Sequence, residues 1–173
     1  MSLFRVPFYP VIKVLLDVLS KSGIGLEWFD GAEQPEYINS LFKNQAEIKY
    51  GVFGLSDADV RQNKTKIFWD FWLDLEVYSN YQGRKEIAQT LQSLLGYFNS
   101  REAVDALSDG LQAEGYLLTD LEVGKLHMGL PMYNDIGIWQ NGSAPVKFLL
   151  EQVDESSSDA ESDGNDGNEV NEA

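Results

Sequence analysis

The sequence predicts an α+β domain in which two or three helices pack against a mixed, mostly antiparallel sheet, followed by a disordered acidic C-terminal tail. Three observations support this fold class. Residues 67–78 alternate in polarity with period two, as a strand with one buried face does. Separate segments carry apolar residues at helical spacing. Several strand-like segments follow one another through short turns, which favours antiparallel pairing with the helices on one face.

The segment 67–78, IFWDFWLDLEVY, is the strongest strand signal. One set of alternate positions is wholly apolar and is expected to face the core: Trp69, Phe71, Leu73, Leu75 and Val77. The other set mixes aromatic and acidic side chains: Phe68, Asp70, Trp72, Asp74, Glu76 and Tyr78. The strand is therefore predicted to bury one face only.

The remaining elements follow from the same two periodicities. Helices are expected at 10–22, where Pro10 suits a helix N-terminus, at 84–98, and from 101 to about Gly110. Further strands are expected at 26–29, 48–55, 117–128, 136–139 and 146–153. Residues 31–47 are expected to be a loop with one helical turn at most, and 56–65 a connecting loop. The segment NGSAP at 141–145 predicts a hairpin-like turn between the last two strands.

The charge is distributed unevenly along the chain of 173 residues. Lys and Arg number 13 against 28 Asp and Glu, for a net charge of −15. Residues 154–173 hold eight of the acids and no base, and such a composition is typical of disorder. We therefore predict one folded domain over residues 1–153, with a net charge of −7, and a disordered tail over 154–173.

Composition excludes several classes of function. The chain has no cysteine and one histidine, His127, so thiol catalysis, disulfides and zinc–thiolate sites are ruled out. His127 lies in a strand-like pattern without a nucleophile motif and is expected to be an ordinary strand or surface residue. The acidic balance argues against gripping nucleic acid through a basic surface. With no long apolar run and no secretory signal, a soluble cytoplasmic protein is expected.

Three carboxylates on one strand face leave several interpretations open. Asp70, Asp74 and Glu76 could form a solvated outer face, could bind a divalent ion or act in acid–base catalysis, or could line a channel that repels DNA. The tail offers a fourth acidic pattern, because Asp159, Glu161 and Asp163 precede Gly164 as in a calcium loop. Position 170 is Val rather than Glu, so a solvated tail is favoured there.

The run WLDLEVYSNYQGRKEIAQTLQSLLGYF carries a family resemblance. A strand is followed by Ser79, Tyr81, Gly83 and Arg84 and then by an amphipathic helix. Upstream lie an N-terminal helix, a D-G-A-x-x-P segment at 30–35 and an aromatic-glycine strand at 50–55. Over about residues 8–150 this layout resembles the tail terminator (tail completion) proteins of long-tailed bacteriophages, although the acidic tail after Val153 lies outside that pattern.

The resemblance implies a structural virion protein, not an enzyme, that needs no cofactor. Such subunits assemble as a ring, expected here to be a homo-hexamer, which caps the tail tube and ends its polymerisation. The implied partners are the major tail tube protein and a head completion or connector protein, with DNA only as passing cargo and no membrane. The expected location is the head–tail interface of the virion, after assembly in the cytoplasm of a host bacterium.

Within this interpretation, particular residues are assigned to two surfaces. The candidates for a DNA-facing lumen are Asp70, Asp74 and Glu76. The candidates for subunit contacts are Phe68, Trp72, Tyr78, Tyr81, Arg84 and Trp139, since aromatic residues and Arg favour interfaces. Two alternatives remain: an acidic DNA mimic that inhibits a host DNA-binding protein, and a carboxylate–metal enzyme built on the same three acids.

Overall fold

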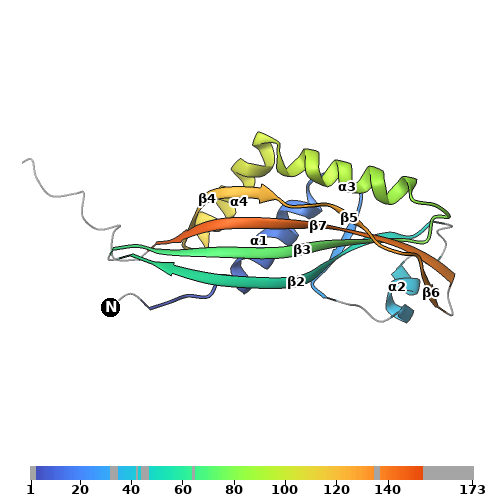
Figure 1. The fold of residues 1–173 in the computed structure, drawn as a ribbon, viewed down its shortest axis with the longest axis horizontal. Coiled ribbons are helices and arrows are strands. Elements are labelled where there is room, and N and C mark those ends of the chain that lie inside the picture. The colour runs from blue at the N-terminus through green and yellow to red at the C-terminus, as the bar shows by residue number, and fades with distance from the viewer. Residues whose placement is uncertain are drawn as a thin grey trace, which may run out of the picture.

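The predicted α+β class, with a mixed, mostly antiparallel sheet and helices packed against it, is confirmed by the structure, a computed structural model that describes residues 3–31, 35–41, 43, 47–63, 65–134 and 137–153. The predicted acidic tail at 154–173 lies outside the described residues. The sheet has the strand order β1-β2-β3-β7-β4, with β5 and β6 also paired to β7 (Figure 1). Its strands are β1 (Glu27–Phe29), β2 (Lys49–Gln62), β3 (Ile67–Ser79), β4 (Tyr116–Val123), β5 (His127–Met128), β6 (Met132–Asn134) and β7 (Gly137–Gln152). Only the β1–β2 pair is parallel, and every other pair is antiparallel.

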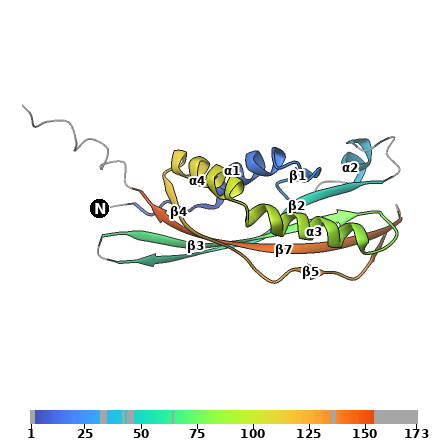
Figure 2. The ribbon, with the colours of Figure 1, turned by 90° about the horizontal axis from the view of Figure 1, so that it is seen from above.

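The described helices are α1 (Phe8–Ser20), α2 (Pro35–Leu41), α3 (Lys85–Phe98) and α4 (Arg101–Ala113). Three of them, α1, α3 and α4, cover one face of the sheet. Figure 2 shows α1 and α4 on one side of β3 and β7, and the β5 segment on the other. The apolar stripes of α1, α3 and α4 join the inward side chains of β3 and β7 in one core. The opposite face, which carries Tyr78, meets α2 at one end, where Ile38 packs with Phe29 and Trp139. The rest of that face is covered by no described helix, and we call it the open face.

The alternation of β3 is the clearest agreement between sequence and structure. Its apolar positions are all buried: Trp69, Phe71, Leu73, Leu75 and Val77 are at most 5% exposed. The other positions, apart from Asp70, are half-buried or exposed and lie on the open face. Burying such side chains contributes roughly 1.5–3 kcal/mol each, so the strand has one stable register.

Two strand predictions were too short. Residues 56–62, expected to be a loop, continue β2 as the partner of β3 after a bulge between Phe53 and Ser56. Residues 141–145, expected to be a hairpin turn, lie inside the single 16-residue strand β7. Gly142 is needed there for packing rather than turning: a Cβ on it would lie 2.7 Å from Ile87 Cγ2 and 2.9 Å from the His127 carbonyl oxygen. Because Gly142 has no Cβ, α3 and β5 can approach β7 closely.

Helix predictions were wrong at two places. Residues 35–41 form α2 rather than a loop with one turn. Helix α4 does not end near Gly110 but continues to Ala113. A Cβ on Gly110 would lie 2.6 Å from Val14 Cγ1, so this glycine allows α1 and α4 to cross closely. The start of α4 is capped as sequence rules expect, with Ser100 Oγ accepting from the Ala103 amide at 3.2 Å.

Candidate functional site: the open face of the sheet

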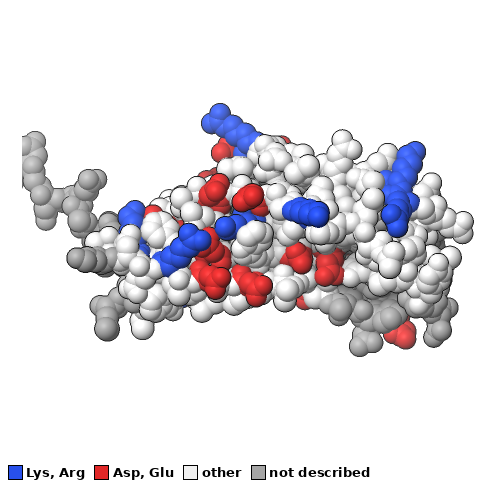
Figure 3. Space-filling view, in the orientation of Figure 1, with Lys and Arg blue, Asp and Glu red and all other residues white. Residues whose placement is uncertain are grey.

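The open face gathers acidic side chains from three strands. The register places Asp59 beside Asp70 and Asp57 beside Trp72, while Glu122 of β4 lies beside Lys147 of β7. Further acids on this face are Asp74 and Glu76 of β3 and Asp120 of β4. Figure 3 shows Asp and Glu gathered over the middle of this face, with Lys and Arg among them and around them. The face therefore presents a negative potential.

Asp70 is buried within this group and its charge is balanced. Its side chain is 8% exposed and forms ion pairs with Arg61 and, at 3.5 Å from Nζ to Oδ1, with Lys147. Lys147 also lies over the Trp72 ring, with Nζ 5.1 Å from the ring centroid. Two cations therefore surround this carboxylate, and Asp70 contributes little to the potential outside.

Asp74 and Glu76 are placed differently. Neither forms an ion pair within the part of the chain that the structure describes. Burial, and then the nearby charges of Glu76 and Asp57, raise the pKa of the Asp74 carboxyl above its ordinary value. Glu76 accepts a hydrogen bond from the Tyr78 hydroxyl at 2.5 Å, and burial together with that bond raises the Tyr78 pKa. These two carboxylates are thus not paired with a cation among the described residues.

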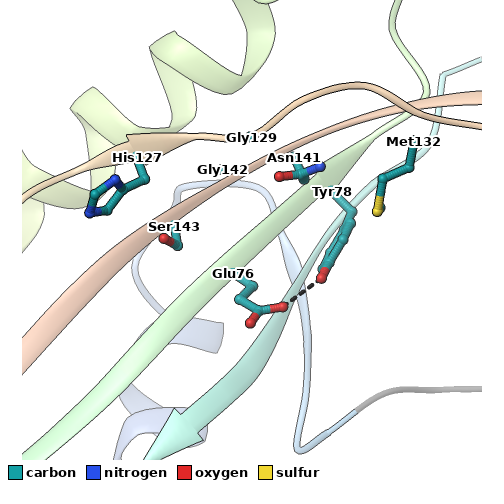
Figure 4. A pocket seen from close by; sticks show the side chains of 8 residues that line it. All are labelled: Glu76, Tyr78, His127, Gly129, Met132, Asn141, Gly142 and Ser143. Carbon is teal, nitrogen blue, oxygen red and sulfur yellow. Dashed lines mark hydrogen bonds between the residues drawn. The ribbon is translucent and has the colours of Figure 1, made fainter.

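A hollow of about 260 Å³ lies beside Glu76, where β3, β5 and β7 meet (Figure 4). The side chains of Glu76, Tyr78, His127 and Asn141 line it, together with Ser143. His127 is exposed on β5 opposite Ser143, and its charge lowers the pKa of Asp74 slightly against the larger effects above. The hollow is polar and open, and no nucleophile–base pair is recorded among the described residues that line it.

The segment that carries the family resemblance forms the junction between β3 and α3. Ser79 is fully buried and its hydroxyl donates to Glu86 in the first turn of α3, while the Tyr81 amide donates to Ser79 Oγ at 3.1 Å. Gly83 has a φ of 128°, which a side chain rarely adopts. The motif thus fixes the turn that sets the angle of α3, and it leaves Arg84 exposed and Tyr81 half-buried.

The remaining aromatic candidates lie in three environments. Trp72 is 38% exposed on the open face, and Phe68 is half-buried beside Glu151. Tyr78 stacks on Tyr50 with ring centroids 5.4 Å apart. Trp139 is only 6% exposed, because it packs in a second small core with Phe29, Ile38 and Ile48. Of these four, Trp72 offers the largest accessible aromatic surface to a partner.

Local patterns in the sequence do not identify the acids that neighbouring strands bring to this face. Asp57 and Asp59 lie in a segment predicted to be a loop, and no local pattern points to Asp120 and Glu122 as site residues. The signal for the first pair was present, since Ala58 and Val60 alternate with Asp57, Asp59 and Arg61. The low strand propensity of Asp obscures this alternation. The neighbours of β3 also depend on the strand order, which local patterns do not contain.

The described residues show two further properties that bear on function. They contain no group of three or more His, Asp or Glu residues placed to hold a metal ion. None of their helices combines the length and the apolar character that crossing a membrane requires. What the open face itself presents is fixed negative charge beside the exposed ring of Trp72, which suits it to repelling anions and attracting cations.

Comparison with known proteins gives little beyond this geometry. No protein-family model matches the sequence, and no curated protein matches it. Among solved structures, the chain is similar to one in the virion of a native gene transfer agent particle, with a TM-score of 0.34 and 14% identity over 83% of this chain and 90% of that one. A TM-score of that size does not establish a shared fold, and the proposal below does not rest on it.

Proposed function

We propose that this chain is a structural, non-enzymatic subunit of a phage-like virion that acts as a tail terminator. In this role, copies form a ring, expected to be hexameric, that caps the tail tube and offers a joining surface for the head. The observation that carries the proposal is the β3–α3 junction, whose Ser79, Tyr81, Gly83 and Arg84 stand in the order that the terminator proteins share. The fold around it matches the compact subunit that the resemblance implies.

In the mechanism we propose, the tail tube stops growing because the two sides of the ring differ in the surface that they present. One side of the ring docks on the open end of the tube because it matches the end surface of a tube subunit. The other side offers no such surface, so no further tube subunit adds and elongation stops. The contacts are expected from the segments 31–46, 56–66 and 131–144, of which the structure describes only parts.

The open face supplies the DNA-facing lumen in this proposal. Asp74 and Glu76 form no ion pair among the described residues, and Asp57, Asp59, Asp120 and Glu122 extend their negative charge across neighbouring strands. A wall of like charge repels a polyanion over roughly a Debye length of 8–10 Å at physiological salt. DNA could therefore pass without adhering. Asp70 adds little to this wall, because Arg61 and Lys147 balance its charge.

The first test is the mass in solution, measured by light scattering with and without purified tail tubes. The proposal expects a six-fold mass, or a ring seen at tube ends by electron microscopy. A monomer that does not bind tail tubes and that competes with DNA for a host DNA-binding enzyme would instead support the alternative of an acidic DNA mimic.

The lumen assignment has its own test with a matched control. Reversing two charges with Asp74→Lys and Glu76→Lys should leave the ring assembled and impair DNA passage or head joining. Asp105→Lys and Asp109→Lys make the same change of charge on the exposed side of α4 and should leave infectivity unchanged. Normal infectivity of the first variant, or equal loss in both, would contradict a lumen at this face.

A further inference from the structure

The distal half of β2 forms an edge of the sheet that no described strand covers. Beyond β2 the sheet contains only β1, and β1 pairs with residues 50–52 alone. Residues 56–62 therefore have β3 on one side and no strand of the described chain on the other. An uncovered edge presents unpaired backbone donors and acceptors and is a template for another strand.

The outward-facing backbone groups of this edge can be identified. The Asn63 amide donates to the Lys66 carbonyl oxygen at 3.1 Å, so these two residues form a hydrogen-bonded pair across the hairpin. Bonded and non-bonded pairs alternate along an antiparallel ladder. Counting back from Asn63, the N–H and C=O groups of Gln62, Val60 and Ala58 point away from β3 and toward the free edge.

The two faces of this edge differ in chemistry. On the helix side lie Ala58 and Val60, and Val60 is 47% exposed. Their cross-strand partners are Phe71 and Trp69. The N-terminal segment adds two more rings on this side, since Phe8 packs against Phe71 at 5.6 Å and Phe4 against Trp69 at 6.4 Å between ring centroids. Phe4 itself is 51% exposed. An apolar surface therefore lies next to the uncovered edge of β2.

On the open face the same edge carries Asp57, Asp59 and Arg61, and Arg61 forms an ion pair with Asp70 of β3. Asp57 and Asp59 are both exposed and form no ion pair within the described residues. A hollow of about 490 Å³ lies against them, lined also by Leu55, Trp72 and Asp74. A strand added to this edge would therefore meet apolar side chains on one face and uncompensated carboxylates on the other.

We propose that the free edge of β2 binds an extended segment of a different protein, in which basic residues alternate with apolar ones. Strand addition of this kind takes affinity from main-chain hydrogen bonds and specificity from alternate side chains. The basic residues would face Asp57 and Asp59, and the apolar residues would face Val60 and Phe4. The inference does not depend on the ring proposed above.

Charge argues against the opposite edge of a second copy as the occupant. That edge is β4, which brings Asp120 and Glu122 to the open face. Continuing one sheet into the next through β2 and β4 would place these acids beside Asp57 and Asp59, and like charges directly opposite each other are destabilising.

The test uses the full chain and a capped peptide of about eight strictly alternating Lys and Val residues. A peptide of the same composition with Lys and Val in two blocks is the control, because it binds the acidic tail equally well but cannot present two faces. At about 0.15 M salt, the alternating peptide should bind at least about tenfold more tightly. Hydrogen exchange should slow at Ala58, Val60 and Gln62.

Two variants locate the contact. Asp57→Asn with Asp59→Asn leaves the exposed edge folded and should lower affinity for the alternating peptide by about tenfold or more. Val60→Pro removes an outward amide without removing a bond to β3, and should abolish protection, whereas Val60→Thr should retain it. Equal binding of both peptides, or no protection of the edge amides, would overturn the proposal. So would protection in the free protein that grows with concentration, because a second copy would then be the occupant.

Discussion

Replacing Gly142 with Ala tests the packing of α3 and β5 on β7. The backbone at this position is compatible with Ala, because Gly142 is not among the glycines with positive φ. Local reasoning then predicts a gain of about 0.4–1 kcal/mol, since Ala restricts the unfolded chain more than Gly does. The tertiary structure predicts the opposite sign. The new methyl group would lie 2.7 Å from Ile87 Cγ2, 2.9 Å from Leu91 Cδ1 and 2.9 Å from the His127 carbonyl oxygen.

Overpacking of this kind typically costs about 1–3 kcal/mol, so the net loss in the free energy of unfolding should be about 1–2 kcal/mol. The measurement is urea unfolding of Gly142→Ala beside the parent protein, with the slope checked for two-state behaviour. Gly96→Ala in α3 is the matched control, because nothing lies within 4 Å of its Cβ position. It should gain about 1 kcal/mol from helix propensity. A Gly142→Ala protein as stable as the control would refute the reasoning.

Three further outcomes follow from the contacts. Gln152→Ala removes the carboxamide that accepts from the Arg5 amide and from Trp69 Nε1; it should cost about 1–3 kcal/mol in urea unfolding and speed hydrogen exchange at Arg5, and unchanged exchange there would contradict this role. The raised pKa of Asp74 means that its ionisation disfavours the folded state, so stability should fall as pH rises above its ordinary value of 3.8; Asp74→Asn should weaken that fall, as thermal unfolding at several pH values would show. Ser100→Ala should cost about 1 kcal/mol by removing the cap of α4, while Ser100→Asp should retain most of the stability.

The sequence by itself determined those elements whose local pattern and tertiary role agree. The alternation of β3 requires one buried face, and burial follows it closely, with Phe71, Leu75 and Val77 fully buried. The apolar stripe of α1 is likewise a local signal that the structure satisfies. The candidate acids Asp74 and Glu76 could be placed on one face for the same reason, since side chains two residues apart on a strand share a face.

Other features were decided only by the tertiary structure. Gly142 and Gly110 carry turn and helix-end signals in the sequence, yet each lies inside a continuous element because a neighbouring element needs the space of a missing Cβ. Asp57 and Asp59 became part of the open face only when β2 extended along β3. Local patterns record how a residue suits its own segment. They do not record which segments become neighbours, and that pairing decides which glycines, carboxylates and edges acquire a role.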